Sequence, residues 1–148
     1  MSVGLLQVGC EGNRLKEIHL VVSNSREVKK IYSREVTDNF SAIKAIRFIE
    51  NMFRRHNIHR CYSFGNRSKR VLRLNMIEED YTGYFNKINN DLIDCKRIIA
   101  KKSGVPKEKW DSTTLDDLKA IHGLALKSNM DALDVVEDLI QICSNLVE

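Results

Sequence analysis

Acidic residues are missing from a long stretch in the first half of this chain. No Asp or Glu occurs between Glu50 and Glu78, yet the same stretch holds seven Lys or Arg and two His. Residues 1–75 carry 15 basic and 6 acidic residues, whereas residues 76–148 carry 9 and 14. The net charge of +4 therefore combines a basic half with an acidic half, which predicts a polyanionic partner for the basic half.

Proline, long hydrophobic runs and paired cysteines are also scarce. A single proline argues against proline-rich linkers, and no apolar run approaches the length of a membrane span. Met1 to Gln7 lack the layout of a signal peptide. The four cysteines are isolated, without a Cys-x-x-Cys pair, which is typical of reduced thiols in a cytoplasmic protein.

The composition that is present suits a folded domain. The chain has 148 residues, of which 43% are hydrophobic and 30% are charged. We expect one domain over residues 1–148, with a basic strand-rich half at 1–76 and an acidic helical half at 77–148. The predicted class is α/β (α+β): a small antiparallel or mixed sheet with one packed helix, followed by a helical C-terminal half.

Hydrophobic periodicity predicts the elements of the first half. Residues 15–24 alternate, so that Ile18, Leu20 and Val22 face a core while Glu17 and His19 lie on the opposite side. An amphipathic helix follows, capped by Asp38 or Asn39 and ended by His56-Asn57. The strands are expected at residues 3–8, 15–24, 28–36, 58–64 and 70–76, the last two joined by a basic turn at Gly65-Asn66.

The second half has a helical period. One long helix is expected from Glu78 to a stop at Gly104. Thr114 and the acids after it form a capping box for a second helix, and Ser128-Asn129 caps a third.

A short motif in the first half is similar to a known family. Gln7-Val8-Gly9-Cys10-Glu11-Gly12-Asn13 keeps a Cys-x-Gly-Asn turn after the first strand, and Thr37-Asp38-Asn39 opens the first helix. With the order strand, strand, strand, helix, strand, these features of residues 3–66 resemble the opening of the ribonuclease H fold.

The resemblance implies a relative without catalysis. Members of that family hold two divalent cations with carboxylates, and the metal ions activate water on a phosphodiester. The matching positions here are Gln7, about Ala42, and Gly65 or Asn66, none of which is acidic. Sites without carboxylates do not supply the hard, charged oxygen ligands that Mg²⁺ requires.

The basic residues of the first half are the candidate binding residues. We expect them to contact the phosphates of a nucleic acid or another polyanion, with Tyr62 and Phe64 placed to stack on bases. Two alternatives remain open: a solvated surface, or cations paired with the acids of the second half. The candidate residues are Lys44, Arg47, Arg54, Arg55, Arg60, Arg67, Lys69, Arg70 and Arg73.

No catalytic, cofactor or metal motif is found in the sequence. His56, His59 and Cys61 lie close together, but a structural zinc site needs four ligands and no second pair follows. We therefore expect a non-enzymatic nucleic-acid or nucleoprotein binding protein, with no cofactor and no membrane association. The alternative is a protein-interaction module, an inhibitor or accessory subunit, that docks a partner protein through its acidic C-terminal helices. A hydrolase with an unrecognised acid cluster ranks last.

Overall fold

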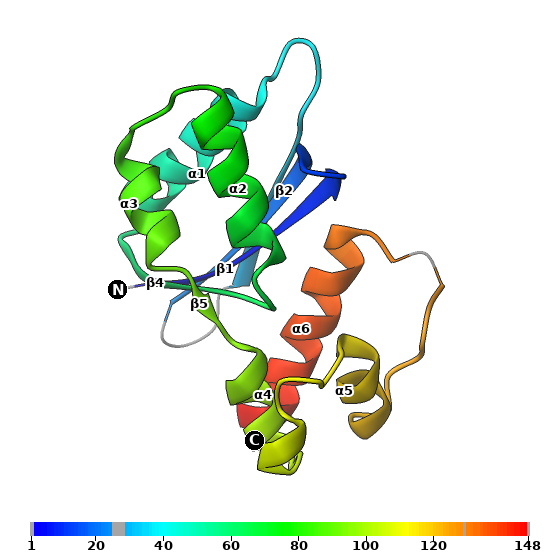
Figure 1. Ribbon diagram of the computed structural model, residues 1–148. Coiled ribbons are helices and arrows are strands. Elements are labelled where there is room, and N and C mark those ends of the chain that lie inside the picture. The colour runs from blue at the N-terminus through cyan, green and yellow to red at the C-terminus, as the bar shows by residue number, and fades with distance from the viewer. Residues whose placement is uncertain (1, 25–28, 129, 148) are drawn as a thin grey trace.

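A five-stranded mixed sheet organises the molecule (Figure 1). The computed structural model describes residues 2–24, 29–128 and 130–147. β1 pairs antiparallel with β2 and parallel with β4; β2 pairs antiparallel with β3, and β4 pairs parallel with β5, in the order β3-β2-β1-β4-β5. The strands are β1 (Ser2–Glu11), β2 (Arg14–Asn24), β3 (Lys29–Glu35), β4 (Ile58–Ser63) and β5 (Ile93–Asp94).

Helices cover both faces of this sheet. The helices are α1 (Ala42–Arg55), α2 (Arg67–Glu78), α3 (Tyr84–Asn90), α4 (Lys96–Lys102), α5 (Leu115–Ile121) and α6 (Ala132–Val147), with a short 3-10 turn, Lys107–Lys109, before α5. Figure 1 shows α1, α2 and α3 on one side of the sheet and α6 on the other. The α+β class expected from the sequence is confirmed.

The larger hydrophobic core lies beneath α1, α2 and α3. Leu6, Ile18 and Leu20 point from the sheet into this core, where Ile46 of α1 and Leu72 of α2 meet them without solvent exposure. Burial of such side chains contributes roughly 1.5–3 kcal/mol each relative to an exposed position. The amphipathic periods of α1 and β2 therefore set the packing of this layer.

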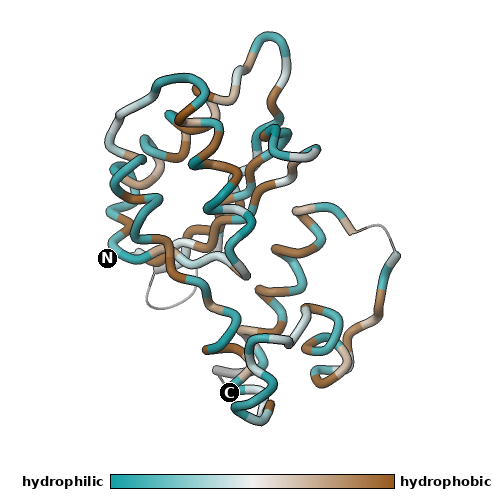
Figure 2. The backbone as a smooth tube through the Cα atoms, viewed as in Figure 1, coloured by the Kyte–Doolittle hydropathy of each residue, from teal (hydrophilic) through white to brown (hydrophobic). Residues whose placement is uncertain are grey.

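A second core lies between the sheet and the C-terminal helices. Leu118 of α5 packs with Leu139 and Ile142 of α6, and hydrophobic residues alternate with polar ones along α6 (Figure 2). On the sheet, His19 and Val21 of β2 are buried by this layer. The sheet is therefore covered on both faces at β2, because an amphipathic helix from the far end of the chain packs on the side opposite Ile18 and Leu20.

Two predicted elements differ from the structure. Residues 70–76 belong to helix α2 instead of a strand, so the basic hairpin tip at 65–69 is the start of a helix. Apolar residues at 72, 74 and 76 suit a strand, but buried Val71, Leu72, Asn75 and Met76 follow the helical period. The long helix expected from Glu78 is instead three elements, α3, β5 and α4. Asp80 takes a positive φ before α3, and α3 ends with Asn89 and Asn90, a residue type that favours helix ends.

The helix caps agree only in part with those predicted from the sequence, and the cysteines agree fully. Ser41, rather than Asp38 or Asn39, caps α1 by accepting a hydrogen bond from the Lys44 backbone N–H. The Thr114 capping box of α5 is confirmed. All four cysteines lie outside disulfide bonds, as expected, and burial raises the pKa of Cys95 to about 12. Among the helices of the described residues, none is long and apolar enough to cross a membrane.

Candidate nucleic-acid interface

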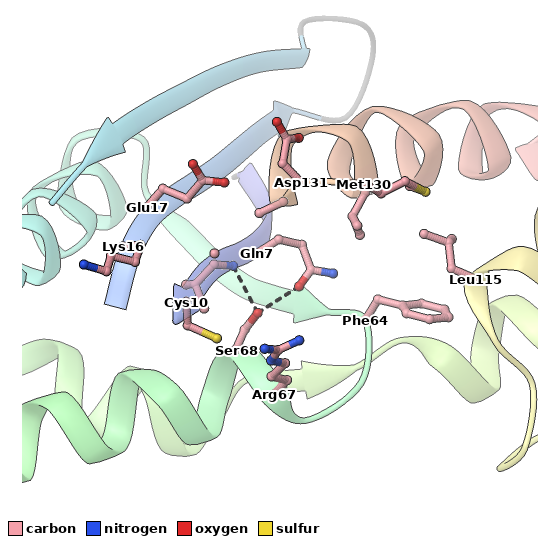
Figure 3. A pocket seen from close by; sticks show the side chains of 14 residues that line it. Gln7, Cys10, Lys16, Glu17, Phe64, Arg67, Ser68, Leu115, Met130 and Asp131 are labelled. Atoms are coloured by element: carbon pink, nitrogen blue, oxygen red, sulfur yellow. Dashed lines mark hydrogen bonds between the residues drawn. The ribbon is translucent and has the colours of Figure 1, made fainter. Parts of the chain in front are cut away.

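A pocket of about 460 Å³ opens where β1 ends, between the first turns of α2 and α6 (Figure 3). Outside the carboxyl ends of strands is where open α/β sheets commonly bind ligands. The sheet supplies the floor, β2 one side, and the helices the rim. The lining residues are Gln7, Val8, Gly9, Cys10, Lys16, Glu17, Phe64, Arg67, Ser68, Leu115, Met130, Asp131, Ala132 and Val135.

A hydrogen-bond chain fixes the floor of the pocket. The Val8 backbone N–H donates to Ser68 Oγ at 3.1 Å, so the Ser68 hydroxyl donates onward to Gln7 Oε1 at 2.8 Å. This order leaves the Gln7 Nε2 amide as a donor that has no acceptor among the described residues, although only 5% of Gln7 is exposed. In Figure 3 this nitrogen points away from Ser68, toward Phe64 and Leu115.

Helix α2 begins at the pocket without a side-chain cap. Asn66 makes no capping hydrogen bond and the first turn contains no acid, whereas Arg67, Lys69 and Arg70 all lie there. In the described part of the chain, the backbone N–H groups of residues 67–69 have no acceptor. The positive end of the helix therefore lies beside two exposed arginines, Arg67 and Arg70, whereas the ammonium of the half-buried Lys69 donates to the Asn90 carbonyl at 2.9 Å.

Helix α6 begins on the opposite rim with its own acids. The Asp134 backbone N–H donates to Asp131 Oδ1 at 2.8 Å, and the Asp131 backbone N–H donates to Asp134 Oδ2 at 3.2 Å. The first of these bonds holds the pKa of Asp131 below its usual range. Asp131 thus caps α6, a role expected of Ser128 or Asn129; Asn129 lies outside the described residues.

The second carboxylate of the pocket, Glu17, is also engaged. Glu17 Oε1 lies 3.2 Å from His19 Nε2, at an angle that does not suit a hydrogen bond. The Glu17 chain crosses Gly9 so closely that a Cβ there would fall 2.4 Å from Glu17 Cγ. Position 9 must therefore be glycine for Glu17 to take this place.

The structure divides the nine candidate cations into groups. Four lie on α2, at Arg67, Lys69, Arg70 and Arg73, but only Arg67 also lines the pocket. On α1, the guanidinium groups of Arg47 and Arg54 lie over the rings of Tyr81 and Tyr84, 5.9 and 4.7 Å from the ring centroids. The Lys44 ammonium donates to the Asn39 carbonyl, Arg55 is exposed at the end of α1, and Arg60 of β4 lines a different pocket.

Ion pairs do not join the two charged halves. Within residues 2–24, 29–128 and 130–147, each pair connects groups of the same half, such as Arg54 with Glu50 and Lys119 with Asp138. Arg54 is the only one of the nine candidate cations with a carboxylate partner there. Neutralisation of the basic half by the acidic half of the same chain, the alternative left open above, is not found among these residues.

The pocket has no constellation for hydrolysis. In the described part of the chain, no three His, Cys, Asp or Glu residues lie together as metal ligands. Of the positions matched to ribonuclease H carboxylates, Gln7 lines the pocket, whereas Ala42 and Gly65 do not. What the pocket does offer is a set of donors: the Gln7 amide, the Arg67 guanidinium and the open amides of α2.

Sequence reasoning did not identify Gln7 or Ser68 as members of a donor set. Ser68 is separated from Gln7 by 61 residues, and a serine in a basic run carries no signal of that contact. Phe64 was expected beside the cations, and it does line the pocket with Arg67.

Comparison of the chain with models of protein families, with curated proteins and with solved structures gives no significant match.

Proposed function

We propose that the protein binds nucleic acid, or a similar polyanion, without cutting it, and that α2 and its adjoining pocket make the contact. The observation that carries this proposal is the start of α2. It combines an uncapped, acid-free first turn with two exposed arginines, Arg67 and Arg70, and a third exposed arginine follows at Arg73.

This arrangement is unfavourable for folding on its own. Cations at a helix N-terminus oppose the positive end of the helix dipole and forgo about 0.3–1 kcal/mol that acids would contribute there. Proteins depart from such local preferences mainly at functional sites. A phosphate group bound at this position would reverse the sign of the interaction, because it would accept from the open amides and meet the arginines.

The pocket suits one end or turn of such a ligand. The Gln7 amide and the Arg67 guanidinium supply donors for phosphate oxygens, and the half-buried Phe64 ring supplies a surface on which a base can stack. Glu17 and Asp131 set a limit, since their charges disfavour further phosphates deeper in the pocket. The remaining phosphates are then expected along the exposed α2 arginines, Arg70 and Arg73.

Binding without cleavage follows from the same residues. A neutral amide at Gln7 donates to a phosphate but does not bind Mg²⁺ as a carboxylate does. The order of β1, β2, β3, α1 and β4 supports the proposed likeness to the ribonuclease H fold, in a non-catalytic form.

The test is fluorescence anisotropy with labelled single-stranded RNA and DNA oligonucleotides over a salt series. Wild-type binding should weaken steeply with salt, and the triple variant Arg67→Gln, Arg70→Gln and Arg73→Gln should lower the slope of log K against log salt by about 2. The matched control, Lys101→Gln with Lys102→Gln at the end of α4, removes exposed cations elsewhere and should leave the slope within about 0.5 of wild type. No binding at low salt, or equal loss in the control, would refute the proposal.

Docking of a partner protein through the acidic helices has less support. Asp138 and Asp134 form ion pairs with Lys119 and Lys127 of the same chain, so these carboxylates already have partners. Glu137 is exposed on the same helix.

A further inference from the structure

A second pocket, of about 400 Å³, lies at the opposite end of β4 from Phe64. Its walls are Phe53 of α1, Ile58 of β4, Ile88 of α3 and Ile93 of β5. The volume lies in the range of small-molecule sites, which combine apolar walls with a few placed polar groups. None of these residues lines the pocket beside α2.

The rim of this pocket is cationic. Arg60 and Lys87 are exposed and have no carboxylate partner among the described residues, and Asp91 is the only acid in the lining. His59 Nδ1 donates to the Ser2 carbonyl at 2.9 Å, which leaves Nε2 as the open nitrogen of the ring. Two fixed positive charges against one negative charge favour an anion at the rim.

An aromatic ring and a free strand edge complete the site. Tyr84 is 45% exposed, and the Arg54 guanidinium lies 4.7 Å from its ring centroid, which orients the ring beside the pocket. β5 pairs only with Tyr62 and Ser63, so no described strand pairs with residues 58–61 on that side of β4. The open edge offers backbone donors and acceptors next to the apolar walls.

We propose that this second pocket binds a nucleoside monophosphate. Its heterocycle would lie between Tyr84 and the apolar walls, its polar edge would hydrogen-bond to the β4 backbone, and its phosphate would meet Arg60 and Lys87. The separate features each match one part of such a ligand: a planar apolar body, an edge of donors and acceptors, and an anion. The proposal does not depend on oligonucleotide binding at α2.

The experiment is an amide ¹H–¹⁵N NMR titration of the full chain with adenosine monophosphate, with adenosine and inorganic phosphate in parallel. Adenosine monophosphate should shift the amides of Arg60, Tyr84 and Lys87 with a single saturating curve. Adenosine and phosphate alone should each bind at least about tenfold more weakly, because each lacks one part of the contact. Equal shifts with phosphate alone would overturn the nucleotide assignment in favour of a simple anion.

Variants separate this pocket from the surface at α2. Arg60→Glu with Lys87→Glu should weaken adenosine monophosphate binding at least about tenfold, and Tyr84→Leu, at an exposed position, should weaken it as well. The matched control, Arg70→Glu with Arg73→Glu, reverses two exposed charges on α2 and should leave this binding within about twofold. Shifts confined to Gln7 and Arg67, or equal loss in the control, would overturn the proposal even if oligonucleotides bind at α2.

Discussion

Helices α2 and α6 begin on opposite rims of the same pocket, but the charged residues in their first turns have opposite signs. α6 opens with Asp131 and Asp134, which cap each other's backbone N–H groups, and Asp138 one turn later pairs with Lys119. α2 opens with Arg67 and other cations, no acid and no cap. The acids of α6 therefore have partners inside the protein, whereas Arg67, Arg70 and Arg73 of α2 are exposed and have no carboxylate partner among the described residues.

We therefore expect the acids of α6 to contribute to the stability of the fold and the cations of α2 to contribute to binding. Removal of an acid from α6 should lower the free energy of unfolding and leave polyanion binding in place. Removal of a cation from α2 should do the reverse. Each prediction below tests one side of this contrast, in order of the expected effect.

The largest effect is expected at Asp138. Its Oδ2 lies 2.9 Å from Nζ of Lys119, an ionic contact without hydrogen-bond geometry, and the Lys119 side chain has 0% exposure. Asp138→Ala leaves that ammonium buried without its carboxylate, with only the weak acceptor Met130 Sδ at 3.4 Å, and should lower the free energy of unfolding by about 3–5 kcal/mol, measured by urea denaturation. Glu137→Ala, at an exposed position of the same helix, should change it by less than about 0.5 kcal/mol.

A double variant shows whether the loss of stability comes from the unpaired buried charge of Lys119 or from lost packing. Asp138→Leu with Lys119→Met should recover most of the stability that Asp138→Ala loses, because neither charge is then buried. If the double variant is as unstable as the single one, the loss comes from packing instead.

Alanine substitutions at the N-caps of α6 and α2 should lower the free energy of unfolding by different amounts. Asp131→Ala removes an oxygen that accepts from the Asp134 backbone N–H and should lower the free energy of unfolding by about 1 kcal/mol. Asn66→Ala, the equivalent change at α2, removes no capping hydrogen bond and should have a much smaller effect. Equal losses in thermal or urea unfolding would show that α2 is capped in solution.

A charge reversal on α2 should stabilise the fold while it weakens binding. Arg67→Glu places an acid at the positive end of the helix and should raise the free energy of unfolding by about 0.3–1 kcal/mol. The same variant should lower oligonucleotide affinity in the anisotropy assay. A loss of stability together with unchanged affinity would contradict the functional interpretation of α2.

Acid should loosen the start of α6 before it affects α2. Because the pKa of Asp131 is lowered by the Asp134 backbone N–H, its stabilising effect is present above the unfolded-state pKa, near 4, and is lost as pH falls through the lower folded value. The first turn of α2 contains no carboxyl group of its own. Amide NMR shifts followed from pH 6 to pH 2 should show the transition at Asp134, and Asp131→Asn should remove it.

Local patterns in the sequence predicted a good part of this fold. The alternation in β2, the amphipathic period of α1 and the Thr114 capping box each depend on neighbouring residues, and each is found where it was expected. The strand predicted at 70–76 failed because a short apolar run satisfies both periods, and only the buried contacts of Val71 and Asn75 select the helix.

The candidate site was only partly predictable. The cations were identified from their charge, but their grouping depends on α2 being a helix and on Arg60 facing the second pocket. Gln7 was noted as the place of a lost carboxylate, yet its role as an open donor arises from Ser68, 61 residues away. No local pattern encodes a contact of that kind.

The sequence by itself determined the division of charge, the acid-free stretch, the unbridged cysteines and the elements with strong local periods. Only the tertiary structure decided that α6 covers the second face of the sheet, that acids and cations pair within their own halves, and that α2 begins open at a pocket. The physical reason is that periodicity, caps and net charge depend on residues a few positions apart. Pockets and ion pairs instead depend on which distant surfaces bury one another, and that follows from the packing of the whole chain.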